Sequence, residues 1–168
     1  MTQALTPLSL PTVPREFGFF VDGKVVPAGT RDLSERRSPA HDVPVTRIPK
    51  CTTADLDAAV AAARRAFEDR RWSGLGGAAR GAVLLRAAAL IRARAEEIAY
   101  FETLENGKPI AQARGEVMGC ADMFDYASGL ARSLHGDSFN NLGDGLFGLV
   151  TREPVGVVGL ITPWNFPF

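Results

Sequence analysis

The sequence predicts an α/β fold, in which an N-terminal β-hairpin and three packed helices precede the first strand of a parallel sheet. Three observations support this prediction. An Asp-Gly pair lies between two short β-prone runs near the N-terminus. Apolar residues then recur every three or four positions through much of residues 52–136, as in amphipathic helices. Finally, Val155–Ile161 contains only apolar residues and glycine, which is typical of a strand covered on both faces.

The N-terminal part is predicted to begin with an arm and a hairpin. Residues 1–16 contain three prolines and several small polar residues, so we expect a flexible arm. The hairpin is expected over Phe19–Val26, with the Asp-Gly pair at its turn. Residues 28–50 then form a long connection that ends in a short extended piece, Val43–Ile48.

The first helix is expected to start at Thr52–Asp55, where an acid three residues after a threonine resembles a capping box. Its periodicity predicts one apolar stripe. The stripe consists of Leu56, Val60, Ala63 and Phe67.

Two further helices are expected before the last strand. One runs from about Ala78 to a glycine cap at Asn106-Gly107, and its apolar face is formed by Leu84, Ala88, Ile91, Ala95 and Ile98. Pro109 suits the first turn of the next helix, whose apolar face is formed by Ala113, Val117, Cys120, Phe124, Ala127, Ala131 and Leu134. On that helix, the spacing of Gly115 and Gly119 indicates close packing against another helix.

The C-terminal strand is expected to end near Thr162, because Pro163 cannot donate a hydrogen bond to a neighbouring strand. Open α/β sheets bind ligands beyond the carboxyl ends of their strands, so Trp164 and Asn165 become candidate site residues. The Asn165 amide has two N–H donors and can stabilise an oxyanion without a change of protonation. Asn before Phe-Pro is also an ordinary turn residue, and a tryptophan also suits a core position. The residues alone leave these alternatives open.

The composition argues against several function classes. Lys and Arg number 19, as do Asp and Glu, so no net charge favours nucleic acid or an acidic membrane surface. No apolar run approaches the roughly 18 residues of a membrane span, and the N-terminus lacks the pattern of a signal peptide. Cys51 and Cys120 lie far apart, without a C-x-x-C motif, so we expect no metal site and no redox pair. We therefore expect a cytoplasmic protein without a nucleic-acid or membrane partner.

Four stretches of the chain resemble the aldehyde dehydrogenase superfamily. Glu153–Phe168 reads E-P-V-G-V-V-G-L-I-T-P-W-N-F-P-F and is similar to the family pattern E-P-x-G-V-x-x-x-I-x-P-W-N-F-P. Glu102–Pro109 (E-T-L-E-N-G-K-P), Ala113–Val117 (A-R-G-E-V) and the hairpin Phe19–Val26 are also similar to the family. For Glu102–Val117 we expect a structural role, as a helix cap, a turn and a helix start. The resemblance covers the chain from about Phe17 to its end.

The resemblance implies a reaction and the residues that serve it. It implies that Ile161, Thr162, Pro163 and Trp164 contact the cofactor, NAD or NADP, and that the Asn165 amide helps to hold a thiohemiacetal oxyanion. The substrate would be a small-molecule aldehyde, oxidised to a carboxylic acid through a cysteine thiohemiacetal. The last strand has no G-x-G-x-x-G, and family members likewise bind NAD on a Rossmann-like sheet without that fingerprint.

The resemblance also implies a division of the chain and an assembly. Residues 17–138 would be the hairpin and helical part of the NAD-binding domain, and residues 139–153 part of a β element used in subunit association. Residues 154–168 would be the first strand of an incomplete Rossmann-like sheet. A full-length subunit would form a homo-oligomer.

The chain is similar to roughly the first third of a family member. Neither Cys51 nor Cys120 has the sequence context of the family's nucleophile, and no glutamate matches the general base. We therefore expect the 168-residue chain alone to be inactive toward aldehydes. Two alternatives remain open: a noncatalytic helical module that pairs with a full-length subunit or another partner, and a non-functional gene remnant.

Overall fold

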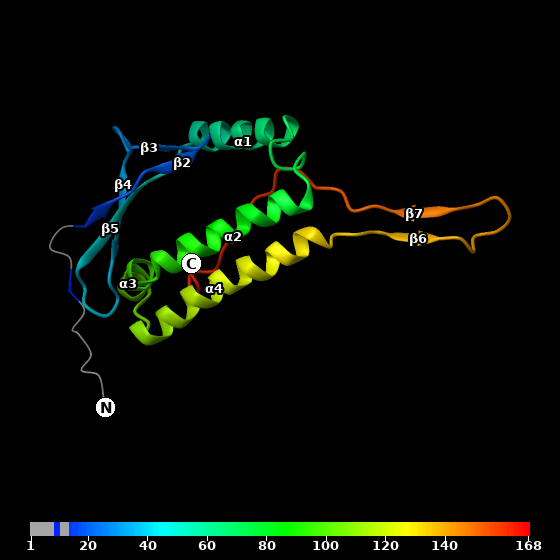
Figure 1. Cartoon of the computed structure of the whole chain (residues 1–168). Helices are drawn as coiled ribbons and strands as arrows, with labels where there is room; N and C mark the ends of the chain where they lie inside the picture. Colours follow the sequence, from blue (N-terminus) through cyan, green and yellow to red (C-terminus); the bar gives the residue numbers. More distant parts are fainter. Residues whose placement is uncertain (1–8, 11–13) are drawn as a thin grey trace, which may run out of the picture.

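The computed structural model describes residues 9–10 and 14–168 and has a mixed α/β architecture (Figure 1). Figure 1 shows strands and α1 on one side, α2 and α4 side by side in opposite directions, and a hairpin that projects away from the helices. The elements are β1 (Arg15–Glu16), β2 (Phe19–Val21), β3 (Lys24–Val26), β4 (Leu33–Arg37), β5 (Pro44–Pro49), α1 (Thr53–Glu68), α2 (Gly77–Ala93), α3 (Ala95–Asn106), α4 (Ile110–Arg132), β6 (Asp137–Phe139) and β7 (Gly148–Val150).

Strand β5 is the centre of a small sheet with the order β1-β5-β4. It pairs in parallel with β1 and antiparallel with β4, which confirms the extended piece predicted at Val43–Ile48. Sequence reasoning did not predict β4, because its sequence LSERR has almost no apolar alternation and its strand geometry depends on pairing with β5. The prediction of an arm over residues 1–16 is wrong for Arg15–Glu16, which form β1. Residues 1–8 and 11–13 lie outside the described residues.

The predicted hairpin over Phe19–Val26 is confirmed. Strands β2 and β3 pair antiparallel, with Phe19 opposite Val26 and Val21 opposite Lys24. Asp22 and Gly23 have φ values of 52° and 75°. Positive φ at both central residues is the geometry of the two-residue turn that matches strand twist, and an Asp-Gly pair tolerates it.

Helix α1 begins as predicted, but its apolar stripe does not face a core. The Thr52 hydroxyl accepts a hydrogen bond from the Asp55 N–H at 3.3 Å, and the Asp55 carboxylate accepts one from the Thr52 N–H at 2.9 Å. These bonds complete the capping box. Leu56, however, is 60% exposed. The side of α1 that carries the buried Ala62 faces the β2–β3 hairpin.

One predicted helix is divided into α2 and α3. The break lies at Arg94, where φ is −111° and ψ is 15°. The predicted cap at Gly107 is confirmed: its φ is 82°, and its N–H donates to the Thr103 carbonyl. A Cβ at Gly107 would also lie 2.9 Å from the Pro39 ring, so both the backbone conformation and the space require glycine here.

The buried core lies where α3 meets the first turns of α4. It consists largely of small side chains, so the helices approach closely. Its fully buried members are Ala99, Ala113 and Val117, and the partly buried side chains against them are Ile91, Ala95, Ile98 and Ile110. Most of these positions were predicted to be apolar faces. Leu134, predicted on the same face, lies beyond the end of α4 and is exposed.

Glycines allow α2 and α4 to pack closely, but they are not the predicted ones. A Cβ added at Gly81 of α2 would lie 2.8 Å from the Ser128 carbonyl oxygen of α4, and one added at Gly77 would meet the Ala131 carbonyl oxygen. Gly115 and Gly119 have no neighbouring atom within 4 Å of such a Cβ. The predicted close packing at Gly115 and Gly119 is therefore wrong, because both face open space.

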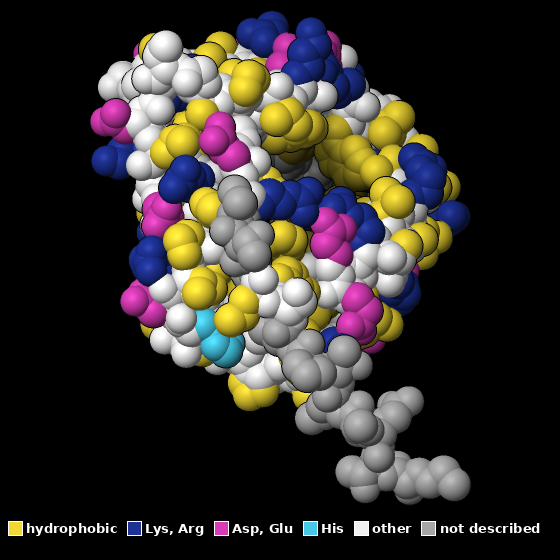
Figure 2. All heavy atoms as spheres, turned by 90° about the vertical axis from the view of Figure 1, so that its left-hand side faces the viewer, with side chains coloured by type: hydrophobic (Ala, Val, Ile, Leu, Met, Phe, Trp, Pro, Cys, Tyr) yellow, Lys and Arg dark blue, Asp and Glu magenta, His cyan; other side chains and the backbone are white. Residues whose placement is uncertain are grey.

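The C-terminal part consists of the projecting β6–β7 hairpin and a segment that returns along the helices (Figure 1). The strand predicted over Val155–Ile161 is not formed in this chain, where the stretch has no regular secondary structure. A strand needs a hydrogen-bonded neighbour, and no described strand lies alongside this stretch. Most of its apolar side chains are consequently exposed, Ile161 fully. Figure 2 shows apolar side chains also lining a hollow on the face at the left of Figure 1.

The close approach of α2 and α4 can be tested with two glycines that lie inside helices. Gly81→Ala places a methyl group against the Ser128 carbonyl, and overpacking typically costs about 1–3 kcal/mol. We expect a net loss of about 1 kcal/mol or more in the free energy of unfolding, measured by urea denaturation followed by circular dichroism. Gly119→Ala is the matched control and should gain up to about 1 kcal/mol from helix propensity alone. Equal effects of the two substitutions would contradict close packing at Gly81.

Candidate active site

The structure places the five predicted site residues on one exposed segment. Ile161, Thr162 and Pro163 lead into a turn at Trp164 and Asn165, and all five are exposed. The Trp164 residue is 81% exposed, so it is not a core residue. The turn is nevertheless fixed to the helical part of the chain, because two of its carbonyl oxygens accept hydrogen bonds from the end of α3 and from Lys108.

Lys108 is buried at the junction between α3 and α4 and holds the turn. Its Nζ donates to Glu102 Oε1 at 2.7 Å, to Glu116 Oε2, and to the Asn165 carbonyl oxygen at 2.9 Å. Nζ also lies 4.9 Å from the centre of the Phe166 ring. An ammonium group has three N–H donors, so the three oxygens match its full donor capacity. We call Glu102, Lys108 and Glu116 the buried ion triad.

A second hydrogen bond fixes the preceding residue. Asn106, the last residue of α3, donates from Nδ2 to the Trp164 carbonyl oxygen at 2.8 Å. Two consecutive carbonyl groups, those of Trp164 and Asn165, are thus held by side chains only two positions apart. The left-handed Gly107 between them directs the chain from the end of α3 to the buried Lys108.

The pKa values of the two carboxyl groups in the buried ion triad shift in opposite directions. Burial raises the pKa of Glu102, even though its hydrogen bond from Lys108 opposes the shift. The hydrogen bond from Lys108 lowers the pKa of the more accessible Glu116. Burial disfavours the charged form of Lys108, but the hydrogen bonds to the two carboxylates outweigh it and raise its pKa.

A cavity of about 710 Å³ lies beside the turn. Trp164 and Asn106 line one part of it, and Arg36 and Arg37 of β4 line another. The exposed turn therefore borders a space that can admit a small molecule. The described residues contain no group of three His, Cys, Asp or Glu side chains arranged to hold a metal ion.

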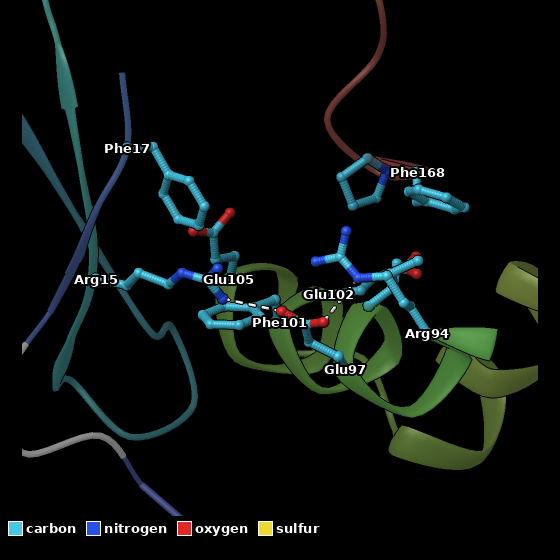
Figure 3. A pocket seen from close by; sticks show the side chains of 10 residues that line it. Arg15, Phe17, Arg94, Glu97, Phe101, Glu102, Glu105 and Phe168 are labelled. Atoms are coloured by element: carbon cyan, nitrogen blue, oxygen red, sulfur yellow. Dashed lines mark hydrogen bonds and ion pairs between the residues drawn. The ribbon is translucent and has the colours of Figure 1, made fainter. Parts of the chain in front are cut away.

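A smaller cavity of about 230 Å³ lies on the other side of the C-terminal segment, between β1, α3 and Phe168 (Figure 3). Figure 3 shows Arg15 and Arg94 reaching Glu97 from opposite sides. Arg94 Nε lies 2.9 Å and Arg15 Nη1 3.0 Å from the carboxylate oxygens. The two hydrogen bonds lower the pKa of Glu97 to about 2, and the bond from Arg94 has the larger effect.

Neither cysteine lines the cavity beside the turn. Cys51 is exposed at the start of α1, and Cys120 is half-buried in α4. Burial raises the pKa of the Cys120 thiol, which reduces the fraction of reactive thiolate. Within the described part of the chain, no helix is long and apolar enough to cross a membrane.

Comparison with known proteins identifies the family. The model of the aldehyde dehydrogenase family matches residues 26–168. The chain belongs to this family. It is 37% identical over 150 residues to an aldehyde dehydrogenase of Aspergillus niger, with 89% of this chain and 30% of that protein covered. It is 36% identical over 149 residues to the NADP/NAD-dependent aldehyde dehydrogenase PuuC of Escherichia coli, with 88% and 30% covered.

Solved structures of the family share the fold. The crystal structure of an NAD-dependent aldehyde dehydrogenase from Sinorhizobium meliloti is 50% identical, with a TM-score of 0.86 over 92% of this chain and 31% of that one. The chain thus spans about a third of the length of the aldehyde dehydrogenases it matches and corresponds to their N-terminal portion.

Sequence reasoning found the exposed turn but missed what holds it. The motif containing Glu102 and Lys108 was assigned only a cap and a turn, and the buried ion triad was not foreseen. The local sequence does not distinguish Lys108 from a lysine in an exposed turn, because its partners lie in the two flanking helices. The acids six positions before and eight positions after it are its partners.

Acidification tests the ion pairs around Glu97. Because its pKa is about 2 in the folded chain, against an ordinary 4.5, the unfolded chain takes up this proton first as the pH falls. The stability that Glu97 contributes is present above pH 4.5 and is lost between pH 4.5 and pH 2. We expect the unfolding free energy of Glu97→Gln, measured by urea denaturation across this range, to fall less steeply than that of the wild type.

The matched control is Glu16→Gln, which removes a carboxylate beside Arg15 but keeps both ion pairs of Glu97. It should retain the wild-type slope. If Glu97→Gln also retained that slope, the two arginines would not lower the pKa of Glu97 in solution.

Proposed function

We propose that this chain supplies the N-terminal hairpin, the helices and the oxyanion-binding turn of an NAD(P)-dependent aldehyde dehydrogenase. The enzyme would oxidise an aldehyde to a carboxylic acid through a cysteine thiohemiacetal. The observation that carries the proposal is the exposed turn of Pro163, Trp164 and Asn165, which has the family motif and is held by two hydrogen bonds to its backbone. The nucleophilic cysteine and the general-base glutamate are not among the residues of this chain that match the family.

In this proposal, Asn165 acts through its uncharged amide. An amide N–H donates to the oxygen of the thiohemiacetal as that oxygen gains negative charge, and it needs no change of protonation. The donor is most useful when it is held in place before the charge develops. The bonded carbonyls of Trp164 and Asn165 supply that constraint, and the exposure of Asn165 leaves it accessible to a substrate.

The same segment fits a nicotinamide cofactor. Ile161, Thr162, Pro163 and Trp164 are consecutive and exposed, and Trp164 borders the cavity of about 710 Å³. We propose that these residues lie along NAD or NADP, which when bound accepts the hydride from the substrate. One relative is named NAD-dependent and another NADP/NAD-dependent, so we leave the choice between the two open.

The domain division follows from the same proposal. Residues 17–138 would belong to the NAD-binding domain, and residues 139–153, which include most of the projecting β6–β7 hairpin, to a homo-oligomer contact. Residues 154–168 would become the first strand of a Rossmann-like sheet once a neighbouring strand pairs with them. The exposed apolar side chains of Val155–Ile161 support this assignment. A cytoplasmic location is part of the same proposal.

Substitution of Asn165 tests the proposed role. In the protein encoded by the complete reading frame, Asn165→Ala should lower kcat for aldehyde oxidation by about 10²- to 10³-fold, the usual cost of losing one oxyanion donor. The measurement is NAD(P)H formation at 340 nm under saturating substrate. The 168-residue chain alone should form no NAD(P)H.

The matched control is Asp57→Ala, which removes an exposed polar side chain of similar size from α1, outside the proposed site and the proposed subunit contact. It should leave kcat near the wild-type value. If Asn165→Ala kept the wild-type kcat, Asn165 would have no role in the reaction. If the 168-residue chain alone oxidised an aldehyde, the proposal that the nucleophile and the general base lie outside this chain would be contradicted.

A noncatalytic module that pairs with a full-length subunit is a second candidate. It is favoured by the extent of exposed apolar surface on Val155–Ile161 and on the β6–β7 hairpin, which a partner would have to cover. Co-expression with an intact aldehyde dehydrogenase subunit distinguishes the two. A stable stoichiometric complex of a chain that ends at Phe168 would support the module.

A further inference from the structure

Among the described residues, the side-chain hydrogen bonds to the turn that carries Asn165 come from the end of α3 and the residues just after it. Asn106 Nδ2 donates to the carbonyl of Trp164, and Lys108 Nζ donates to the carbonyl of Asn165. Both donors come from the short connection at the end of α3, and both acceptors are backbone atoms. The two bonds therefore fix the path of the backbone at Trp164 and Asn165 and leave both side chains exposed.

Lys108 is itself rigidly placed. The side chain is 6% exposed, and carboxylates from two different helices hold its ammonium group. Glu102 lies on α3 and Glu116 on α4, so any shift of Nζ would break a charge-assisted hydrogen bond. Two of the three N–H groups of the Lys108 ammonium already donate to Glu102 and Glu116, and the third donates to the Asn165 carbonyl oxygen.

We propose that Lys108 and Asn106 are positioning residues for Asn165, and that Glu102 and Glu116 act by holding Lys108. This inference rests on the proposed function, because it assigns to these residues the placement of an oxyanion donor. Preorganised donors stabilise a transition state because they need not reorient, and a displacement of about 1 Å at a reacting centre can cost about 10²-fold in rate. The end of α3 thus sets the position of a group 59 residues later in the sequence (165 minus 106).

A purely structural role for the triad explains less. Tying α3 to α4 requires only the bonds from Lys108 to Glu102 and Glu116. It does not account for the bond to the Asn165 carbonyl, and it does not involve Asn106, which binds the adjacent carbonyl independently. The two roles can be separated, because Asn106 can be changed without altering the triad.

The first test measures the order of the turn in the 168-residue chain and does not depend on activity. We expect ¹⁵N relaxation to give order parameters near 0.85 for the amides of Asn165 and Phe166, as in rigid backbone, and below about 0.6 in an Asn106→Asp/Lys108→Met double variant. The carbonyl ¹³C shift of Asn165 should move upfield in Lys108→Met, and that of Trp164 in Asn106→Asp. Amides of α2 should keep their wild-type values.

In Asn106→Asp, the new side chain has nearly the same size as that of asparagine but cannot donate a hydrogen bond to the Trp164 carbonyl oxygen. The substitution leaves the buried ion triad unchanged. It therefore remains informative if Lys108→Met fails to fold. Asn140→Asp in the exposed β6–β7 loop is the matched control and should change none of these signals. An Asn165 turn equally ordered in the wild type and in the folded variants would overturn the proposal.

The second test uses the protein encoded by the complete reading frame. Asn106→Asp, which keeps the triad, should lower kcat with little change in KM, because it removes only the bond to the Trp164 carbonyl. Lys108→Met, which removes the bonds to Glu102 and Glu116 as well as the bond to Asn165, should lower kcat by up to about 10²-fold. In an Asn165→Ala background the same substitution should cause almost no further loss, because Lys108 acts through Asn165. Equal losses in both backgrounds would show that Lys108 does not position Asn165 and would overturn the proposal.

The two tests fail differently. If the proposed function is wrong, the wild-type protein has no aldehyde dehydrogenase activity although the turn is ordered by Asn106 and Lys108. If only the positioning role is wrong, the enzyme is active, Asn165→Ala impairs it, and the order of the turn is independent of both side chains.

Discussion

A single buried ammonium group joins the parts of this chain. Lys108 bonds α3 through Glu102, α4 through Glu116, and the C-terminal segment through the Asn165 carbonyl. Removal of one partner from a buried ion pair leaves an uncompensated charge and typically costs about 3–5 kcal/mol. The site therefore tolerates little change. The turn at residue 107 requires glycine, and this turn brings the Lys108 side chain into the buried junction of α3 and α4. The local backbone conformation and the contact of Lys108 with the C-terminal segment therefore depend on each other.

Small residues make the rest of the arrangement possible. The core between α3 and α4 is built on Ala99, Ala113 and Val117, and α2 approaches α4 where Gly81 leaves room for the Ser128 carbonyl. Such a core buries little apolar area per residue, so its contribution to stability is modest. Ion pairs between elements, of which the buried ion triad is the least exposed, supply geometric specificity that side-chain packing alone would not.

Local signals in the sequence predicted local structure well, and non-local features were missed. The Asp22-Gly23 turn, the Thr52–Asp55 capping box and the Gly107 cap are each fixed by neighbouring residues. Strand β4, by contrast, depends on β5, and the burial of Lys108 depends on acids in two helices. Val155–Ile161 has the composition of a central strand but no pairing partner among the described strands. The site residues were predicted from the family motif, whereas the side chains that hold them come from a motif assigned only a turn.

In the function proposed above, the exposed apolar side chains of Val155–Ile161 are covered when this segment pairs with a strand of its own sheet. The most direct test of this account is the sequence of the encoding DNA beyond the Phe168 codon. We expect an open reading frame that continues into further strands, a cysteine-bearing loop and a later glutamate, which would complete an aldehyde dehydrogenase around Asn165. A stop codon directly after Phe168 would contradict a catalytic role for this chain and leave its exposed strand to a partner.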